Sequence, residues 1–216
     1  MLTGGAGGRA MSRAFEEIFS IADAFQGIPM AGRTDAWILA DAAAAHGVLH
    51  DTSGLERFPD VYLRHLRAEI PNKGPRYGIM PGVPALLDAL ADRDDTYLAL
   101  LTGNYETGAK QKLEHFNLWH YFQCGAFGDG AADRNGLVPK ALARVCECGG
   151  PAFTPSDAVV IGDTPLDVAC AKAGGARSIA VATGNHSVEE LRDAAADVVF
   201  PDLSDTRAVL TSIFGR

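Results

Sequence analysis

The chain has 216 residues, of which 47% are hydrophobic, and it carries a formal net charge of −8 at pH 7. This composition disfavours a disordered chain, and the negative charge disfavours a long nucleic-acid-binding surface. No apolar run approaches the ~20 residues of a membrane-spanning helix, and the first residues lack the charged start and apolar stretch of a signal peptide. We therefore expect a globular protein that binds neither nucleic acid nor a membrane.

The cysteines favour a reducing compartment. The chain has four cysteines, Cys124, Cys146, Cys148 and Cys170; a disulfide framework would be unusual in a chain of this length, and nothing points to secretion. Cys146 and Cys148 form a C-x-C pair, but no second pair has a spacing that suits zinc. We expect reduced thiols and a cytoplasmic protein.

The first third of the chain reads as a series of helices. Apolar residues recur at helical spacing in the segments 9–25, 34–47 and 53–70. Thr34 suits the start of the second segment and Gly47 its end. Pro59 either interrupts the third segment or opens a further helix there. The Gly- and Pro-rich segment 71–82 then marks a break.

After residue 80 the pattern changes to alternating strands and helices. Short apolar runs predict strands at 96–104, 121–129, 157–163, 178–184 and 197–200. Helical patterns stand between them at 83–92, 106–116, 137–149, 165–175, 187–195 and 204–214. This alternation predicts the α/β class with a doubly wound parallel sheet. We expect a helical domain at 6–79 and an α/β core at 80–216.

Polar groups follow two of the predicted strands. "LLTGN" presents Thr102, Gly103 and Asn104, and "VVIGDTPLD" presents Asp163 and Asp167. In an open parallel sheet, ligands bind beyond the carboxyl ends of the strands. A threonine hydroxyl beside the start of a helix suits a phosphate, and two neighbouring carboxylates suit Mg²⁺.

Simpler interpretations exist for each of these residues. Thr102 can serve as a helix cap, and Asp163 can cap the helix that begins near Pro165. Asp167 can be a solvated surface acid. Because the residues end two separate buried strands, a common site is the stronger interpretation.

"LLTGN", "VVIGDTPLDVACAKAGGA" and "GRTD" at 32–35 resemble motifs of the haloacid dehalogenase-like hydrolase superfamily. The similarity covers most of the chain and is greater to the phosphoglycolate-phosphatase-like branch. The resemblance implies a Rossmann-like core with a helical cap, which we place at 6–79. It also implies a Mg²⁺-dependent phosphatase that acts on small phosphorylated metabolites.

The resemblance implies a role for each motif residue. Thr102 would hold the transferring phosphoryl group, with Gly103 and Asn104 beside it. Asp163 would bind Mg²⁺, and Asp167 would support the ion or its water shell. Two residues compete for the family's basic position, usually a lysine. Arg134 fits the family spacing better, and Lys140 lies inside the predicted helix 137–149.

The family's nucleophile is missing from this chain. It is the first aspartate of an Asp-x-Asp-Gly-Thr motif at the end of the first strand, and its second aspartate is the general acid and base. No strand ending in Asp-x-Asp precedes residue 30, and "MLTGGAGG" resembles the residues that normally follow the motif. Asp23 lies in a helical pattern, and Asp41 and Asp51 lie in the cap region. We expect the first central strand to be missing.

Three explanations compete for this absence. The chain starts at an internal methionine, or it is truncated, or the flanking strands close the gap in a non-catalytic remnant. We favour the first two and expect little or no turnover from the chain as given. The alternatives are a non-catalytic binding protein of the same fold and a true haloacid dehalogenase. The dehalogenase is the weaker one, since its chemistry needs no metal.

Two other features carry less weight. Arg33 and Asp35 in "GRTD" would face substrate from the cap, or they form a helix-capping turn with a local ion pair. We count Arg33 as a candidate substrate-binding residue. The Gly-rich segment 3–8 lacks the Gly-Lys-Ser/Thr ending of a nucleotide-binding loop, and no strand precedes it.

Overall fold

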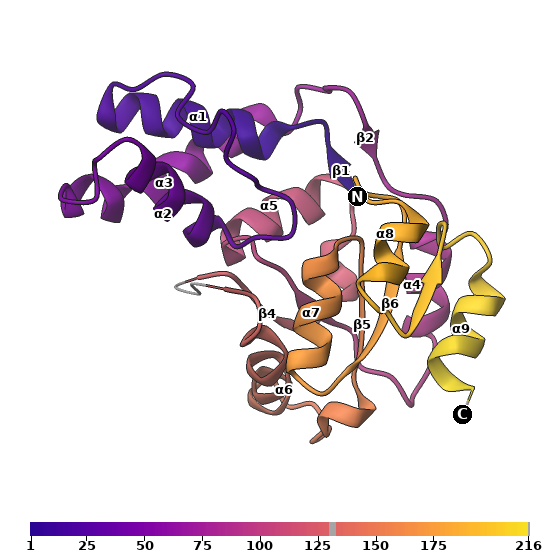
Figure 1. Ribbon diagram of the computed structural model, residues 1–216. Helices are drawn as coiled ribbons and strands as arrows, with labels where there is room; N and C mark the ends of the chain where they lie inside the picture. The colour runs from indigo at the N-terminus through magenta and orange to yellow at the C-terminus, as the bar shows by residue number, and fades with distance from the viewer. Residues whose placement is uncertain (130–132, 216) are drawn as a thin grey trace.

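The computed structural model describes residues 1–129 and 133–215. Three helices stand at one end of the molecule, and alternating strands and helices form the rest (Figure 1). The strands are β1 (Leu2–Thr3), β2 (Tyr77–Gly78), β3 (Ala99–Leu101), β4 (Cys124–Ala126), β5 (Val159–Gly162), β6 (Arg177–Val181) and β7 (Val198–Phe200). The α-helices are α1 (Ala6–Phe19), α2 (Asp35–Ala45), α3 (Thr52–Glu69), α4 (Val83–Ala91), α5 (Glu106–His115), α6 (Leu137–Glu147), α7 (Pro165–Ala173), α8 (Val188–Asp193) and α9 (Thr206–Phe214). Two short 3-10 helices are η1 (Trp119–Tyr121) and η2 (Pro155–Asp157).

Helices α1, α2 and α3 pack around one apolar cluster. Phe15 of α1 and Phe58 and Tyr62 of α3 are fully buried in it. The rings of Phe15 and Phe58 meet edge to face with their centroids 6.3 Å apart. Tyr105, just before α5, belongs to the same cluster. The helical group is therefore fastened to the α/β part through its own core, while the expected domain limit at 79 stays a prediction.

The two ends of the helical group are joined by an antiparallel strand pair. Leu2 of β1 pairs with Gly78 of β2, so the chain enters and leaves the group at one place. Arg9 of α1 reinforces this junction, because its guanidinium donates to the Glu69 carboxylate at 2.7 Å and to the Asn72 carbonyl at 3.0 Å. These contacts hold the base of the helical group.

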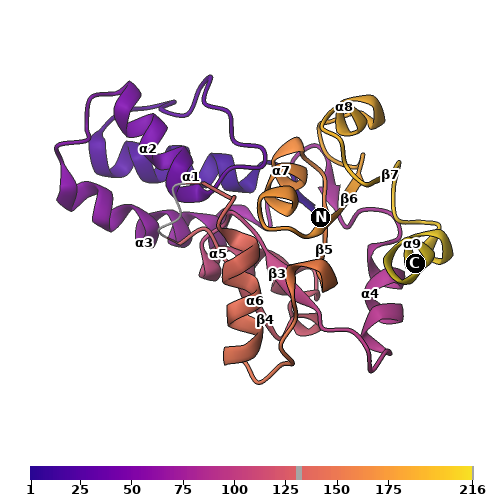
Figure 2. The same cartoon turned by 60° about the horizontal axis from the view of Figure 1, so that its bottom comes forward.

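The α/β part contains two parallel sheets, which confirm the predicted class. One sheet has the order β3-β4 and the other β5-β6-β7. Helices α6, α7 and α8 cover one face, where Val160, Ala180 and Val199 point. Helices α4 and α9 cover the opposite face, which bears Ile161 and Val181. Figure 2 shows this arrangement, with α4 and α9 on the side away from α7.

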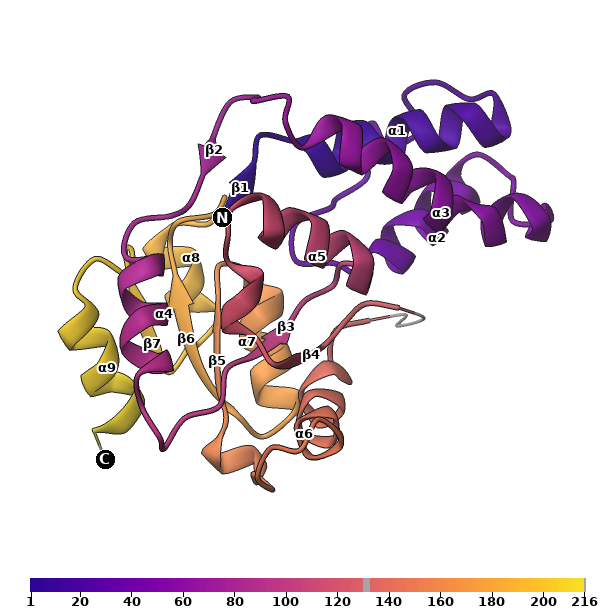
Figure 3. The same ribbon diagram turned by 180° about the vertical axis from the view of Figure 1, so that it is seen from behind.

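Among the described residues, no strand lies between β3 and β5. The two strands do not pair with each other (Figure 3). Leu101 of β3 and Val160 of β5 nevertheless pack against the same cluster. All residues of both strands are only half-buried, whereas most of the central strand β6 is buried. This topology is consistent with the expected missing central strand.

The structure differs from the sequence-based elements in three places. α1 ends at Phe19, where Ser20 adopts a left-handed conformation, yet Phe25 still packs into the helical cluster. The helical periodicity predicted as far as residue 25 therefore reflects burial from a loop. Pro59 lies inside one continuous α3, whose neighbours Phe58 and Tyr62 are fully buried. The two-residue strands β1 and β2 were not predicted, because such short runs carry no periodicity.

Candidate active site

The end of β3 presents a threonine whose hydroxyl accepts two hydrogen bonds. The Asn104 side-chain amide donates to Thr102 Oγ1 at 2.7 Å, and the Asn104 backbone N–H donates to the same oxygen at 3.2 Å. The Thr102 N–H donates to the Ala126 carbonyl at 3.0 Å, so β4 fixes the backbone at this point. Both lone pairs of the hydroxyl are therefore occupied, and its proton is the group it has left to offer.

The helical group approaches this strand end closely. The Asp35 N–H donates to the Gly103 carbonyl at 2.7 Å, and the Tyr105 N–H donates to the Asp35 carboxylate at 2.9 Å. A Cβ on Gly103 would lie 2.3 Å from the Arg33 carbonyl oxygen. Only glycine allows this contact between the two parts. Burial is the main cause that raises the pKa of Asp35, and the charge of Lys112 opposes it.

The end of β5 forms the first turn of α7. Thr164 is the N-cap: its hydroxyl accepts from the Asp167 N–H, and Asp167 reciprocates in a capping box. Asp167 Oδ2 accepts from the Asp163 N–H at 3.1 Å and from the Thr164 N–H at 3.0 Å. The Thr164 hydroxyl donates to the same oxygen at 2.8 Å. Asp167 therefore shapes the loop that carries Asp163.

Arg134 pairs with the other oxygen of Asp167. Its guanidinium donates to Asp167 Oδ1, and the two side chains are only 11% and 9% exposed. The guanidinium also donates to the Gly32 carbonyl of the helical group at 3.3 Å. Arg134 Nε is buried and has no hydrogen-bond acceptor among the described residues. Arg134 thus reaches the second strand end from the loop that precedes α6.

Asp163 is half-buried and lies beside Asp167. Burial and then the charge of Asp167 raise the pKa of Asp163, whereas the Met1 ammonium and Arg134 lower it. Among the described residues, no side chain donates a hydrogen bond to the Asp163 carboxylate. A cation at this position would relieve the charge that these two acids accumulate.

One cavity of about 200 Å³ lies between the helical group and the α/β part. Gly103, Asn104 and Arg134 line it from the α/β side, and Arg33 and Tyr62 line it from the helical side. The Tyr62 hydroxyl is buried there without a partner among the described residues. The cavity therefore joins the residues after β3 to the arginine that pairs with the acid after β5.

Lys112 and Tyr62 are site residues that sequence reasoning missed. Lys112 lines the cavity from α5, and its ammonium donates to Asn104 Oδ1. A signal existed in the sequence, because Lys112 adjoins Leu113 and stands one helical turn after Gly108, and both of these are buried. For Tyr62, aromatic spacing pointed only to core packing.

A site for Mg²⁺ fits the two acids unequally. Mg²⁺ keeps several waters and needs only one or two carboxylates. Among the described residues, no side chain donates to the Asp163 carboxylate, whereas both oxygens of Asp167 already accept hydrogen bonds. Within residues 1–129 and 133–215, no three His, Cys, Asp or Glu side chains gather as a metal cluster. Asp163 therefore suits a direct ligand, and Asp167 suits a supporting position.

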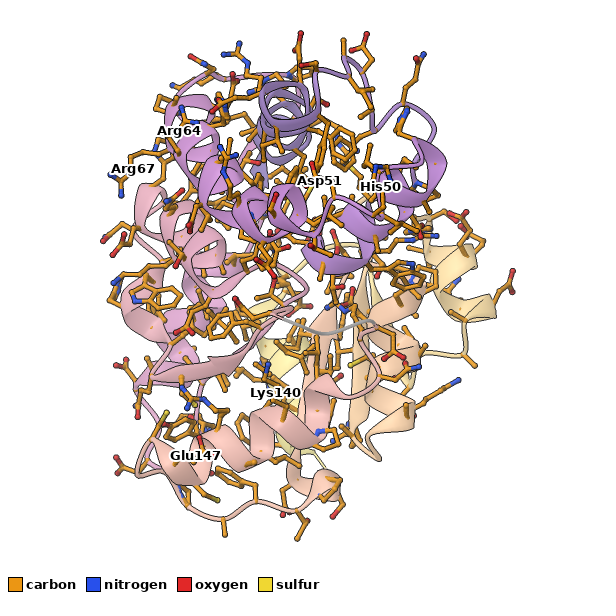
Figure 4. All side chains as sticks on the ribbon, turned by 90° about the vertical axis from the view of Figure 1, so that its left-hand side faces the viewer. His50, Asp51, Arg64, Arg67, Lys140 and Glu147 are labelled. Carbon is orange, nitrogen blue, oxygen red and sulfur yellow. The ribbon has the colours of Figure 1, made fainter. Side chains whose placement is uncertain are left out.

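The two candidates for the basic position differ in their surroundings. Lys140 is solvent-exposed on α6 and donates to the Phe127 carbonyl at 3.1 Å. Figure 4 shows it on that helix, well below the helical group that carries Arg64 and Asp51. Arg134 lines the cavity and pairs with Asp167. This geometry favours Arg134, and its catalytic role stays a prediction.

Arg33 has partners of its own within the helical group. Its guanidinium pairs with Asp41 and lies 4.3 Å from the ring centre of Trp37. Thr34 caps α2 by accepting from the Trp37 N–H at 3.0 Å. The helix-capping turn is therefore present, but the ion pair of Arg33 is with Asp41 and not with Asp35. Arg33 still lines the cavity, so its contact with substrate stays a prediction.

The acids of the helical group do not supply a nucleophile in place of the missing motif. Asp23 has a positive φ of 53° in a turn after α1. Asp41 pairs with Arg33, and Asp51 caps α3 by accepting from the Gly54 N–H. None of these acids lines the cavity. Asp35 does, but its carboxylate accepts from the Tyr105 N–H.

Two further observations concern the chain as a whole. Cys124, Cys146, Cys148 and Cys170 are free thiols. No helix within residues 1–129 and 133–215 has the length and hydropathy that a membrane span requires.

Comparisons with known proteins agree with this architecture. A family model described as HAD-hydrolase-like matches residues 134–206. A probable phosphatase, IndB, from Dickeya dadantii is 30% identical over 127 residues, which are 59% of this chain and 54% of that protein. A probable phosphoglycolate phosphatase from Pseudomonas putida is 26% identical over 175 residues, which are 78% of this chain and 65% of that protein. The chain thus spans about half to two thirds of the length of these relatives.

The fold has close counterparts among solved structures. The crystal structure of a predicted phosphatase from Clostridium acetobutylicum superposes with a TM-score of 0.65 at 20% sequence identity. The superposition covers 96% of this chain and 92% of that one. Family model, sequence relatives and fold point the same way: the chain is similar to hydrolases of the haloacid dehalogenase-like superfamily, and one of its sequence relatives is a probable phosphoglycolate phosphatase.

Proposed function

We propose that this protein is a Mg²⁺-dependent phosphatase of small phosphorylated metabolites, and that Thr102 and Arg134 hold the phosphoryl group. The observation that carries the proposal is the state of the Thr102 hydroxyl. Its oxygen accepts two hydrogen bonds from Asn104, so the hydroxyl must donate to any ligand it meets. A phosphoryl oxygen is a strong acceptor for such a donor.

Arg134 supplies the positive charge in this proposal. A guanidinium offers five N–H donors in one plane and matches phosphate geometry. Arg134 Nε has no acceptor among the described residues, although it is buried. A phosphoryl oxygen at the cavity would satisfy this donor. The Asp167 carboxylate keeps the guanidinium in place, so the charge need not be reorganised during the reaction.

Asp163 would hold Mg²⁺, and Gly103, Asn104 and Arg33 would surround the substrate. When bound, the ion would neutralise negative charge on the phosphoryl oxygens. Asp167 would orient the Asp163 loop through its bonds to the Asp163 N–H and to Thr164. The small cavity of about 200 Å³ supports a compact substrate.

The hydrolytic step needs a carboxylate nucleophile, which this family supplies from an Asp-x-Asp motif. The nucleophile would attack phosphorus, the ester oxygen would leave with a proton, and water would then hydrolyse the aspartyl phosphate. The described residues lining the cavity offer no free carboxylate for this attack. We therefore expect the chain as given to be weakly active or inactive, while it still binds phosphate.

Adding the missing motif tests this function. One variant carries an apolar strand ending in Asp-x-Asp fused before Met1, and the matched control carries the same strand ending in Asn-x-Asn. Hydrolysis of an aryl phosphate is measured with Mg²⁺. We expect turnover only from the Asp-x-Asp variant. If that variant is folded and loaded with Mg²⁺ but hydrolyses no faster than the Asn-x-Asn control, the proposed function is wrong.

A non-catalytic protein that binds phosphorylated ligands is the second candidate. Such a protein would hold its ligand with the same groups, Thr102 and Arg134, but would need no nucleophile. The same pair of variants separates the candidates, because a binding protein would take up phosphate in both and turn over neither. True dehalogenation remains a weaker alternative, since a reaction without a metal would leave the Asp163 carboxylate without a ligand.

A further inference from the structure

A partly buried lysine lines the same cavity as Arg134. Lys112 stands on α5, and its ammonium donates to Asn104 Oδ1. No carboxylate of the described residues lies within ion-pair distance of it. Burial lowers the pKa of Lys112, and the negative charge of Asp35 opposes this shift. A lysine in such a place costs stability, so its contact with Asn104 calls for an explanation.

The ammonium determines which way the Asn104 amide points. A lysine side chain only donates hydrogen bonds, so it must face the carbonyl oxygen of the amide. The amide NH₂ then faces Thr102 Oγ1, at 2.7 Å. If the amide were turned over, its carbonyl would face Thr102 and would accept the hydroxyl proton. The threonine would then have no proton to offer a ligand.

We infer that Lys112 is a positioning residue: through the Asn104 amide it makes the Thr102 hydroxyl a dedicated donor to the phosphoryl group. The inference rests on the proposed function, in which Thr102 holds that group. The backbone N–H of Asn104 fills the second lone pair of Thr102 Oγ1 at 3.2 Å and completes the arrangement. In this role Lys112, which also lines the cavity, acts on the ligand through two hydrogen bonds in series.

A double-mutant cycle on the complete chain tests the inference. The variants are Lys112→Met, Thr102→Val and the double variant, and the probe is inorganic phosphate with Mg²⁺, titrated by calorimetry. Thr102→Val should weaken phosphate binding about tenfold, which is typical for one hydrogen bond to a charged acceptor. Lys112→Met should weaken it by a similar factor when Thr102 is present. In the Thr102→Val background, Lys112→Met should change affinity less than about twofold.

Matched variants separate positioning from general damage. Lys112→Arg keeps a donor for Asn104 Oδ1 and should restore most of the affinity. Lys110→Met removes a half-exposed lysine of the same helix, which lies 3.8 Å from Glu114 and outside the cavity, and should leave affinity unchanged. If Lys112→Arg binds phosphate as poorly as Lys112→Met while both melt as the parent does, the inference is wrong.

A measurement on the unsubstituted chain covers the case in which the variants do not fold. The side-chain amide protons of Asn104 should exchange with solvent far more slowly than those of Asn117, which is exposed. Equal exchange rates would contradict the hydrogen-bonded amide and therefore the inference.

The outcomes distinguish this inference from the proposed function. If Thr102→Val weakens binding and Lys112→Met does not, the inference fails and the phosphoryl site stands. If the two effects multiply in the double variant, Lys112 contacts the ligand directly, and the positioning role is wrong. If Thr102→Val has no effect, phosphate is not held by Thr102, and the proposed site fails as well.

Discussion

Removing Arg134 should destabilise the protein as well as its phosphate site. Arg134→Met leaves the Asp167 carboxylate, only 9% exposed, without its cation. Breaking a buried ion pair by deleting one partner typically costs about 3–5 kcal/mol. Asp167 keeps three donors, from the Asp163 N–H, the Thr164 N–H and the Thr164 hydroxyl. These donors still stabilise its charge, so we expect the lower end, about 3 kcal/mol.

Such a loss is large against a typical domain stability of about 5–15 kcal/mol. Urea unfolding followed by circular dichroism measures it, with Lys140→Met as the control. Because Lys140 is exposed, its substitution should change stability by no more than about 0.5 kcal/mol. The reasoning fails if Arg134→Met and Lys140→Met are equally stable. It also fails if Lys140→Met, rather than Arg134→Met, loses affinity for phosphate.

Three further predictions concern other parts of the molecule. Gly103→Ala should lower the free energy of unfolding in urea by about 1–3 kcal/mol, because its Cβ would lie 2.3 Å from the Arg33 carbonyl oxygen. Gly136→Ala, with open space around it, should leave the stability unchanged, and equal stabilities of the two variants would contradict the close approach. Asp163→Asn should abolish the rise in melting temperature that Mg²⁺ produces, and the exposed control Asp94→Asn should keep that rise. If Mg²⁺ still raises the melting temperature of Asp163→Asn by the same amount, Asp163 is not the metal ligand. The Arg9 hydrogen bond is the main cause that lowers the pKa of Glu69, so the carboxylate stabilises the fold above the unfolded pKa, and this stability is lost as the pH falls through the folded pKa. Glu69→Gln should therefore lower the urea midpoint at pH 7 and approach the parent in acid; a constant difference at both pH values would refute the linkage.

The strands and helices of the α/β part could be predicted because each is a local pattern. Val159–Gly162 is an apolar run that ends in polar residues, and Thr164 with Asp167 is a capping sequence only three residues apart. Such signals survive in a single sequence. Phe25 shows the limit, since its helical spacing was satisfied by a loop that packs into the same cluster.

The arrangement of the candidate site could be predicted only in part. The polar residues after β3 and β5 were identified because parallel strands end at one edge of a sheet. The pairing of Arg134 with Asp167 joins residues far apart in the chain, and no local pattern encodes it. Lys112 was missed because a charged helical residue is usually solvated, although its place beside Leu113 and one turn after Gly108 was a weak signal of its position at the cavity.

The central claim is that Thr102 and Arg134 hold one phosphoryl group. A crystal structure of the chain soaked with tungstate, a heavy analogue of phosphate, tests it most directly. The account predicts anomalous density in the cavity, with tungstate oxygens within hydrogen-bond distance of Thr102 Oγ1 and the Arg134 guanidinium. Tungstate bound elsewhere, with these two side chains unoccupied, would contradict it.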